Sequence, residues 1–190
     1  MELKELASIV VFDIDMDGTL ARWNEKATLE EVASNGYFRN LDPTSFVSLP
    51  LWLEGVGFEV RIRSAVYQDN HSAADKEAWL KKYGLGELPR DFIPYGTPKS
   101  KSMRYDGKIH ILIDDHTPNL VDWENNVYFG TGVKFMNHVN GKHGRWQGRR
   151  ISEEMTAMQM FAELLTIAYG EAMKMNEIKL NISRKKEEVA

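Results

Sequence analysis

The run Asp15-Met16-Asp17-Gly18-Thr19 follows directly on the apolar stretch 8–12, and it constrains the fold more than any other feature. A short apolar, β-branched stretch predicts a buried strand. Two carboxylates at the end of a strand raise each other's pKa unless a cation or a bound group compensates. The pattern therefore predicts a site that takes up a divalent metal and attacks phosphorus with a carboxylate. The alternative is a strand end that leads into a solvated Asp-Gly turn.

Length and composition limit the partners that such a site can have. With 190 residues, of which 43% are hydrophobic, the chain can form one sizeable core with a small attached subdomain. The formal net charge of −4 does not favour a nucleic-acid polymer or an anionic membrane as the main partner. The absence of cysteine excludes disulfides, thiol catalysis and cysteine-bound zinc. A small anionic substrate remains compatible with this composition.

The N-terminal segment is charged at Glu2, Lys4 and Glu5, and Asp13 interrupts the apolar run that follows. This pattern is not that of a signal peptide, and no stretch of the sequence is long enough to span a membrane. We therefore expect a cytoplasmic protein. The sequence leaves open whether it is a monomer or a homodimer.

Apolar strand patterns alternate with helix patterns along the chain. This alternation predicts an α/β fold with a mostly parallel central sheet and helices on both faces, a Rossmann-like three-layer sandwich. The expected strands cover residues 8–12, 58–64, 92–95, 109–113 and 133–136, and the expected helices cover 28–32, 72–83, 119–124 and 152–173, with a helix over 46–53 that Pro50 breaks. We interpret residues 137–150 as a long basic surface loop.

Chemically active side chains follow the ends of four of these strands. Asp15 and Asp17 follow the first strand, Ser64 the second, Lys99 the third, and the pair Asp114-Asp115 the fourth. In parallel sheets the ligand lies beyond the carboxyl ends of the strands, so these groups are expected to meet at one edge.

This set of residues suits phosphoryl transfer. Asp15 and the Asp114-Asp115 pair supply hard oxygen ligands for Mg²⁺, and Asp15 can attack phosphorus to form an aspartyl-phosphate. Asp17 can protonate the leaving alkoxide and later take a proton from the hydrolytic water. Ser64 would donate a hydrogen bond to a phosphoryl oxygen, and Lys99 would offset negative charge.

Three assignments stay open at this point. Ser64 has a purely structural role as its alternative, because it is a single hydroxyl at a strand end. Lys99 competes with Lys101 in the same polar loop. The sequence also leaves open which member of the Asp114-Asp115 pair binds the metal directly.

The set Asp15-Met16-Asp17-Gly18-Thr19, Ser64, Lys99 and Asp114-Asp115 resembles the four motifs of the haloacid-dehalogenase-like (HAD) phosphohydrolases. Within them, the chain is most similar to the 5'(3')-deoxyribonucleotidase branch. This narrower resemblance also rests on the segments 37–41, 77–80, 94–96, 113–120 and 146–148.

The resemblance implies a domain organisation and a metal site. Residues 1–20 and 56–180 would form the HAD-like core, 21–55 a small helical cap, and 181–190 a disordered tail. Asp15, the backbone carbonyl of Asp17, and Asp114 or Asp115 would hold Mg²⁺.

The resemblance also implies a substrate site. The residues expected to bind the substrate are Thr19, Ser64, Ala65 and Lys99 on the core, with Trp23, Tyr37 and Phe38 on the cap packing against a nucleobase. Arg61 and Arg63 depart from the family pattern, because its second strand is normally apolar on both faces.

We therefore expect a Mg²⁺-dependent phosphomonoesterase, most closely a 5'-nucleotidase acting on (deoxy)ribonucleoside monophosphates. One alternative keeps the chemistry and changes the substrate to a sugar phosphate or another small phosphomonoester. A receiver-like phosphoacceptor switch without turnover is a second alternative, and a non-catalytic nucleotide-binding protein is a third.

Overall fold

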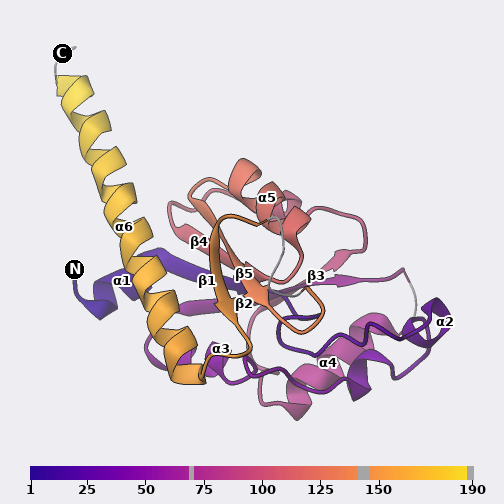
Figure 1. Cartoon of the computed structure of the whole chain (residues 1–190). Coiled ribbons are helices and arrows are strands. Elements are labelled where there is room, and N and C mark those ends of the chain that lie inside the picture. The colour runs from indigo at the N-terminus through magenta and orange to yellow at the C-terminus, as the bar shows by residue number, and fades with distance from the viewer. Residues whose placement is uncertain (69–70, 141–145, 188–190) are drawn as a thin grey trace.

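The computed structural model describes residues 1–68, 71–140 and 146–187, with side chains described as far as Asn181. Within these residues the centre of the molecule is one six-stranded sheet in which every pairing is parallel (Figure 1). The strand order is β3 (Arg90–Pro94), β2 (Glu59–Val66), β1 (Val10–Ile14), β4 (Ile109–Asp114), β5 (Gly130–Met136), β6 (Arg149–Ser152).

This strand order is that of a doubly wound α/β fold. The chain adds β2 and β3 on one side of β1, and then returns to place β4, β5 and β6 on the other side. The predicted α/β class with a mostly parallel sheet is thus confirmed, and the described sheet is wholly parallel. The topological switch lies between β1 and β4, where ligands of such sheets bind at the carboxyl ends of the strands.

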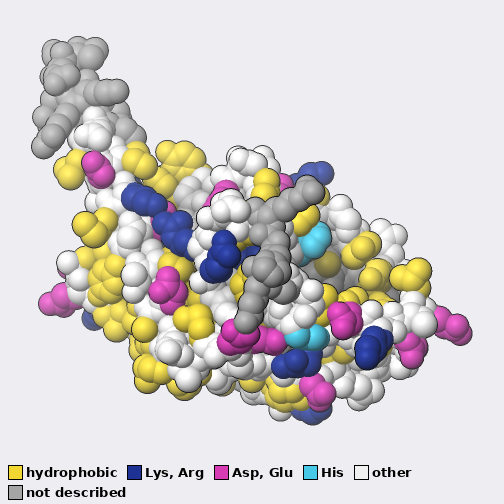
Figure 2. All heavy atoms as spheres, in the orientation of Figure 1, with side chains coloured by type: hydrophobic (Ala, Val, Ile, Leu, Met, Phe, Trp, Pro, Cys, Tyr) yellow, Lys and Arg dark blue, Asp and Glu magenta, His cyan; other side chains and the backbone are white. Residues whose placement is uncertain are grey.

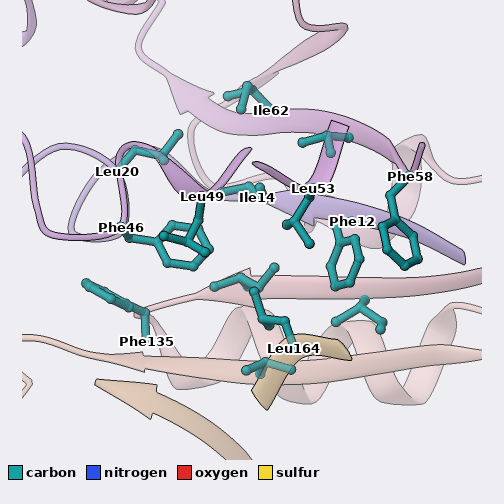
Figure 3. Close-up of a cluster of buried hydrophobic side chains, with 14 of the residues drawn as sticks. Phe12, Ile14, Leu20, Phe46, Leu49, Leu53, Phe58, Ile62, Phe135 and Leu164 are labelled. Carbon is teal, nitrogen blue, oxygen red and sulfur yellow. The ribbon is translucent and has the colours of Figure 1, made fainter. Parts of the chain in front are cut away.

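One face of the sheet is apolar. Alternate residues of β1 and β4, such as Phe12 and Ile111, point to this face and are fully buried. They pack with α1 (Leu3–Ile9), α3 (Leu49–Gly55) and α6 (Ala157–Glu187), and Figure 3 shows side chains from the strands, α3 and α6 meeting in a single cluster. Removal of this apolar surface from water is the main stabilising contribution to the fold.

The opposite face is partly charged. The intervening strand residues include Asp13, Arg63 and His110, each at most 2% exposed. Helix α5 (Thr117–Asn126) covers this face and contributes Trp123 to a second, smaller apolar cluster with Trp146. Arg61 and Arg63 of β2 depart from the expected pattern of a strand that is apolar on both faces. The charged face explains this departure in part, because Arg63 points away from the apolar face.

Several element boundaries differ from the prediction. Residues 149–152 form strand β6, which overlaps the end of the segment 137–150 interpreted as a surface loop; residues 141–145 of that segment lie outside the described residues. Helix α6 consequently begins at Ala157 rather than near residue 152. Helix α6 continues to Glu187 instead of ending near Met173, because 171–187 contains no Gly or Pro to stop it. The helix thus includes much of the segment expected to be disordered, and its C-terminal part extends beyond the layered body (Figure 1).

The polypeptide between β1 and β2 forms short helices. Thr28 caps α2 (Leu29–Val32) as predicted, with Glu31 N donating to Thr28 Oγ1 at 3.2 Å. Pro50 lies in the first turn of α3, where helix N–H groups have no intrahelical acceptor, so it begins the helix rather than breaking it. The cap boundaries proposed above stay a prediction.

Helix α4 (Ser72–Lys82) joins β2 to β3 and begins at the expected position. The spacing of Ser72 and Asp75 predicts a capping box at its start, but this prediction is wrong. The Ser72 hydroxyl accepts a hydrogen bond from Tyr67 N, and the Asp75 carboxylate accepts one from Gly36 N at 2.6 Å. Asp75 therefore holds the segment between β1 and β2 against α4. In the part of the chain that the structure describes, no helix is both long and apolar enough to cross a bilayer.

Candidate active site

The candidate site lies at the carboxyl edge of the sheet, beside the topological switch. Asp15 directly follows β1, and Asp114 is the last residue of β4. Ser64 lies on β2, two residues before the strand ends at Val66. Lys99 begins the short 3-10 helix η2 (Lys99–Ser102). The structure thus brings together the groups that the sequence assigned to four strand ends.

Lys99 lies between two aspartates. Its Nζ donates to Asp15 Oδ1 at 2.5 Å and to Asp114 Oδ2 at 2.6 Å, and all three residues are at most 6% exposed. Asp114 also accepts from His116 N at 2.7 Å and from Asn119 Nδ2 at 2.9 Å. Lys101 is exposed, so Lys99 is the lysine of this loop that reaches the site.

The burial of these charges shifts their pKa values. Burial raises the pKa of Asp15 well above its ordinary value; the charge of Lys99 opposes this increase, and the charges of Asp114, Asp17 and Asp115 add to it. Burial lowers the pKa of Lys99, but Asp114 and Asp15 outweigh burial and raise it overall. Lys99 therefore stays an ammonium ion and compensates only one of the negative charges around it.

Asp115 adds a third carboxylate to the cluster. Burial and the neighbouring charge of Asp114 raise the pKa of Asp115 to about 7, although Asn137 Nδ2 donates to its Oδ2 at 3.0 Å. One carboxylate oxygen from each of Asp15, Asp114 and Asp115 lies within 4.8 Å of the others. The charges of Asp115 and Asp114 also act on the buried Lys134 of β5. Three hard oxygen donors that lie this close together fit a divalent cation such as Mg²⁺, which would relieve their mutual repulsion.

Asp17 also belongs to the site and is held by a lysine that sequence reasoning missed. Lys76 on α4 is fully buried, and its Nζ pairs with Asp17 Oδ2. The same nitrogen donates to Ser64 Oγ at 2.8 Å and to the carbonyl of Ala65 at 2.5 Å. It also lies 4.6 Å from the centre of the Phe38 ring, a cation–π contact. One ammonium group thus fixes both Asp17 and the end of β2.

These groups surround a cavity of about 350 Å³. The residues that line it are Asp15, Asp17, Trp23, Phe38, Ala65, Tyr67, Tyr95, Lys99, Asp115, His116, Asn119 and Val139. Asp17 Oδ1 is buried and has no hydrogen-bond partner among the described residues. A buried carboxylate oxygen without a donor is costly, and a ligand that brings a proton would satisfy it.

Aromatic side chains form one wall of this cavity. Trp23 and Phe38 line it, whereas Tyr37 packs edge-on against both of them with ring centres 6.1 and 5.1 Å away. Tyr67 and Tyr95, which the sequence analysis did not single out, stack with their ring centres 4.8 Å apart. The wall therefore comes from both the segment 21–55 and the ends of β2 and β3.

Besides Tyr37, two more of the expected substrate-binding residues, Thr19 and Ser64, do not line the cavity. Thr19 is fully buried, and its carbonyl accepts a hydrogen bond from Thr44 Oγ1 at 2.5 Å. Ser64 is also fully buried and touches Lys76, while its neighbour Ala65 lines the cavity. Because Lys76 donates to Ser64 Oγ, the hydroxyl proton of Ser64 remains available for another acceptor.

The missed residues left different signals in the sequence. Lys76 lies three and four residues before Trp79 and Leu80, hence on the apolar face of α4, and a lysine there is unusual. Tyr67 and Asn137 each come one residue after a strand, at the same edge as the aspartates. Tyr95 left no signal, because its place depends on how the loop after β3 folds.

Fold and site together define a doubly wound α/β protein with four aspartates, held in part by the buried lysines Lys76 and Lys99, at the carboxyl edge of a parallel sheet. Comparison with protein-family models and with curated proteins found no match to the sequence. On the face of the molecule shown in Figure 2, acidic and basic side chains are interspersed rather than gathered by sign.

Proposed function

We propose that this chain is a Mg²⁺-dependent phosphomonoesterase of the HAD-like class, with a Rossmann-like three-layer core, that hydrolyses nucleoside monophosphates. The observation that carries the proposal is that Asp15 and Asp17 both line one cavity and each is held by its own buried lysine. A two-step phosphoryl transfer requires one carboxylate that acts as a nucleophile and another that acts as an acid, and different neighbours allow two aspartates to take these two roles.

Asp15 is the proposed nucleophile. Lys99 holds Asp15 Oδ1, so Asp15 Oδ2 is the oxygen that forms the bond to phosphorus while the bond from phosphorus to the alcohol oxygen breaks. Asp15, Asp114, Asp115 and the carbonyl of Asp17 would hold Mg²⁺, which supplies positive charge beside the phosphoryl oxygens. Lys99 adds further positive charge at the same place.

Asp17 is the proposed general acid and base. Lys76 fixes its Oδ2, its Oδ1 has no donor among the described residues, and the residue lines the cavity. Asp17 would protonate the departing alkoxide, and then accept a proton from the water that attacks the aspartyl-phosphate and releases inorganic phosphate. Lys76 keeps Asp17 in one orientation during both steps.

The cavity supports a nucleotide as the substrate. Its volume of about 350 Å³ and its wall of Trp23, Phe38, Tyr67 and Tyr95 suit a flat, partly apolar ring attached to a phosphate. The resemblance to the 5'(3')-deoxyribonucleotidase branch supports the same choice. A cytoplasmic location is part of the proposal.

The test is a turnover assay with Mg²⁺ on a panel of nucleoside monophosphates, sugar phosphates and a generic phosphate ester. We expect many turnovers with release of inorganic phosphate and a preference for nucleotides. Equal rates on all esters would remove the nucleotide assignment, and a single phosphorylation without turnover would favour a phosphoacceptor switch.

Substitutions in the site make the test specific. Asp15→Asn should reduce kcat at least about 10³-fold, and Asp17→Asn about 10²- to 10⁴-fold. The matched control is Asp42→Asn, an exposed aspartate on the segment between β1 and β2 that lies outside the cavity wall. Full activity of Asp15→Asn would refute the proposal.

A further inference from the structure

A chain of hydrogen bonds crosses the charged face of the sheet and ends at Lys99. It begins at the surface with Asp106, whose carboxylate lies 3.1 Å from His110 Nε2. His110 Nδ1 lies 2.9 Å from Asp13 Oδ2, and Asp13 Oδ1 accepts from Arg63 Nε at 2.5 Å. These residues come from β1, β2, β4 and the loop before β4, and the proposed mechanism uses none of them.

Arg63 is the rigid part of this chain. It is 1% exposed, and its guanidinium lies 5.6 Å from the centre of the Trp123 ring. Asp13 holds its Nε, so the direction of its remaining donors is fixed. A buried arginine of this kind is costly unless all its donors are used, and two of its hydrogen bonds leave from NH1.

One of these two bonds leads to the loop that carries Lys99. Arg63 NH1 donates to Ser102 Oγ at 2.6 Å, and Ser102 Oγ donates in turn to the carbonyl of Lys99 at 3.0 Å. The other bond of NH1 goes to Asp91 at the sheet edge, at 2.7 Å. The hydroxyl oxygen of Ser102 therefore makes one hydrogen bond within η2, to Lys99, and one hydrogen bond that connects η2 to the sheet, from Arg63.

We infer that Arg63 is a positioning residue that acts through Ser102: it fixes η2 on the sheet and thereby keeps the Lys99 ammonium between Asp15 and Asp114. Without this tie, η2 keeps the main-chain bond from Met103 N to Ser100 O at 3.0 Å at its end and the bond from Ser100 N to Asp122 Oδ2 on α5 at 3.3 Å. Lys99 Nζ lies 2.5 Å from Asp15 Oδ1 and 2.6 Å from Asp114 Oδ2. Since the ammonium has to stay close to both carboxylates, a shift of the Lys99 backbone would lengthen at least one of these two distances.

The primary test uses Ser102→Ala. Arg63→Met would leave the buried carboxylate of Asp13 without its partner and endanger folding. Ser102→Ala removes only the hydroxyl that links Arg63 to the carbonyl of Lys99, and Ser102→Thr keeps a hydroxyl at this position. The matched control is Asp91→Asn, which alters the other acceptor of the same guanidinium nitrogen and does not touch η2.

Two readouts are needed, because the kinetic one rests on the proposed function. The first is amide hydrogen exchange at Lys101 and Met103, whose N–H groups bond within η2 and its flanks; it needs no activity. The second is kcat for a nucleoside monophosphate with Mg²⁺. Melting temperatures equal to that of the wild type would show that the variants are folded.

We expect Ser102→Ala to exchange these amides about tenfold faster and to lower kcat about tenfold, with Ser102→Thr and Asp91→Asn close to the wild type. Unchanged exchange in Ser102→Ala, or an equal loss in Asp91→Asn, would overturn the inference. If the wild type hydrolyses no phosphate ester, the proposed function fails, and the exchange data alone decide whether Arg63 and Ser102 position η2.

Discussion

The carboxylate of Asp115 lies directly against the backbone of Gly18, so that a Cβ atom on Gly18 would be 2.3 Å from Asp115 Oδ2. Asn137 Nδ2 bridges the two residues, with hydrogen bonds of 2.7 Å to the carbonyl of Gly18 and 3.0 Å to Asp115. Gly18 also has φ +82°, a backbone conformation that favours glycine. The turn after β1 and the end of β4 are therefore fitted to each other at this glycine.

Gly18→Ala should accordingly disturb the acidic cluster. The positive φ costs about 1–2 kcal/mol for alanine, and Asp115 must move to make room. We expect a lower free energy of unfolding and weaker Mg²⁺ binding, measured by chemical denaturation with and without Mg²⁺. The control is Gly170→Ala on α6, where a Cβ meets nothing within 4 Å and helix propensity predicts a gain of about 1 kcal/mol.

Lys76→Met should impair catalysis strongly. It removes the donor shared by Asp17, Ser64 and the carbonyl of Ala65, while the apolar chain still packs against Phe38. Loss of one partner of a buried ion pair costs about 3–5 kcal/mol of stability. We expect kcat to fall about 10²-fold or more. Lys81→Met, on the exposed side of the same helix, is the control, and an equal rate for both variants would contradict the role of Lys76.

Much of the fold could be predicted because its strands carry strong local patterns. The strand 109–113 is apolar except for His110, and 58–64 alternates, which the structure explains by one apolar and one partly charged face. Strand β6 could not be predicted in this way. Only Ile151 of its four residues is buried, so an edge strand of this kind looks like a loop in the sequence.

The aspartates of the site could be predicted because they directly follow buried strands, and the topology of a parallel sheet brings strand ends together. Lys76, Tyr67 and Tyr95 reach the site through the packing of α4 and of the loops after β2 and β3, which no local pattern determines. Arg63 was noted as a departure from an apolar strand. Its partners come from three other strands or loops, so its function could not be inferred before the fold.

Asp115→Asn should distinguish two effects of this carboxylate on stability: repulsion between the aspartates without Mg²⁺, and stabilisation by bound Mg²⁺. Without a cation, burial and the charge of Asp114 raise the pKa of Asp115 to about 7, so its ionised form is unfavourable in the folded protein. The variant should therefore be more stable than the wild type at about pH 8 without Mg²⁺. The wild type should gain about 2.7 kcal/mol at a Mg²⁺ concentration of 100 Kd, and Asp115→Asn much less. Thermal unfolding against Mg²⁺, with sodium chloride at equal ionic strength as control, measures both effects.

His110 should make stability depend on pH in a defined direction. Both ring nitrogens face carboxylates, Asp13 and Asp106, so the folded state favours the doubly protonated ring. Burial lowers the pKa of His110, but hydrogen bonds and charge from Asp13 and then Asp106 outweigh it, and the pKa is raised above 6.5. The remaining groups nearby are Trp123, which packs on the ring, and Lys108 beside Asp106.

Because this pKa is raised in the folded state, the stabilisation is fully present below pH 6.5 and is lost as the pH rises through the folded value. The difference in unfolding free energy between wild type and His110→Asn should thus decrease from acidic to alkaline pH, as measured by urea denaturation across that range. Asp106→Asn removes one of the two carboxylates and should shift the decrease to lower pH. A difference that stays constant or grows with pH would show that Asp13 and Asp106 do not hold His110 as an imidazolium ion.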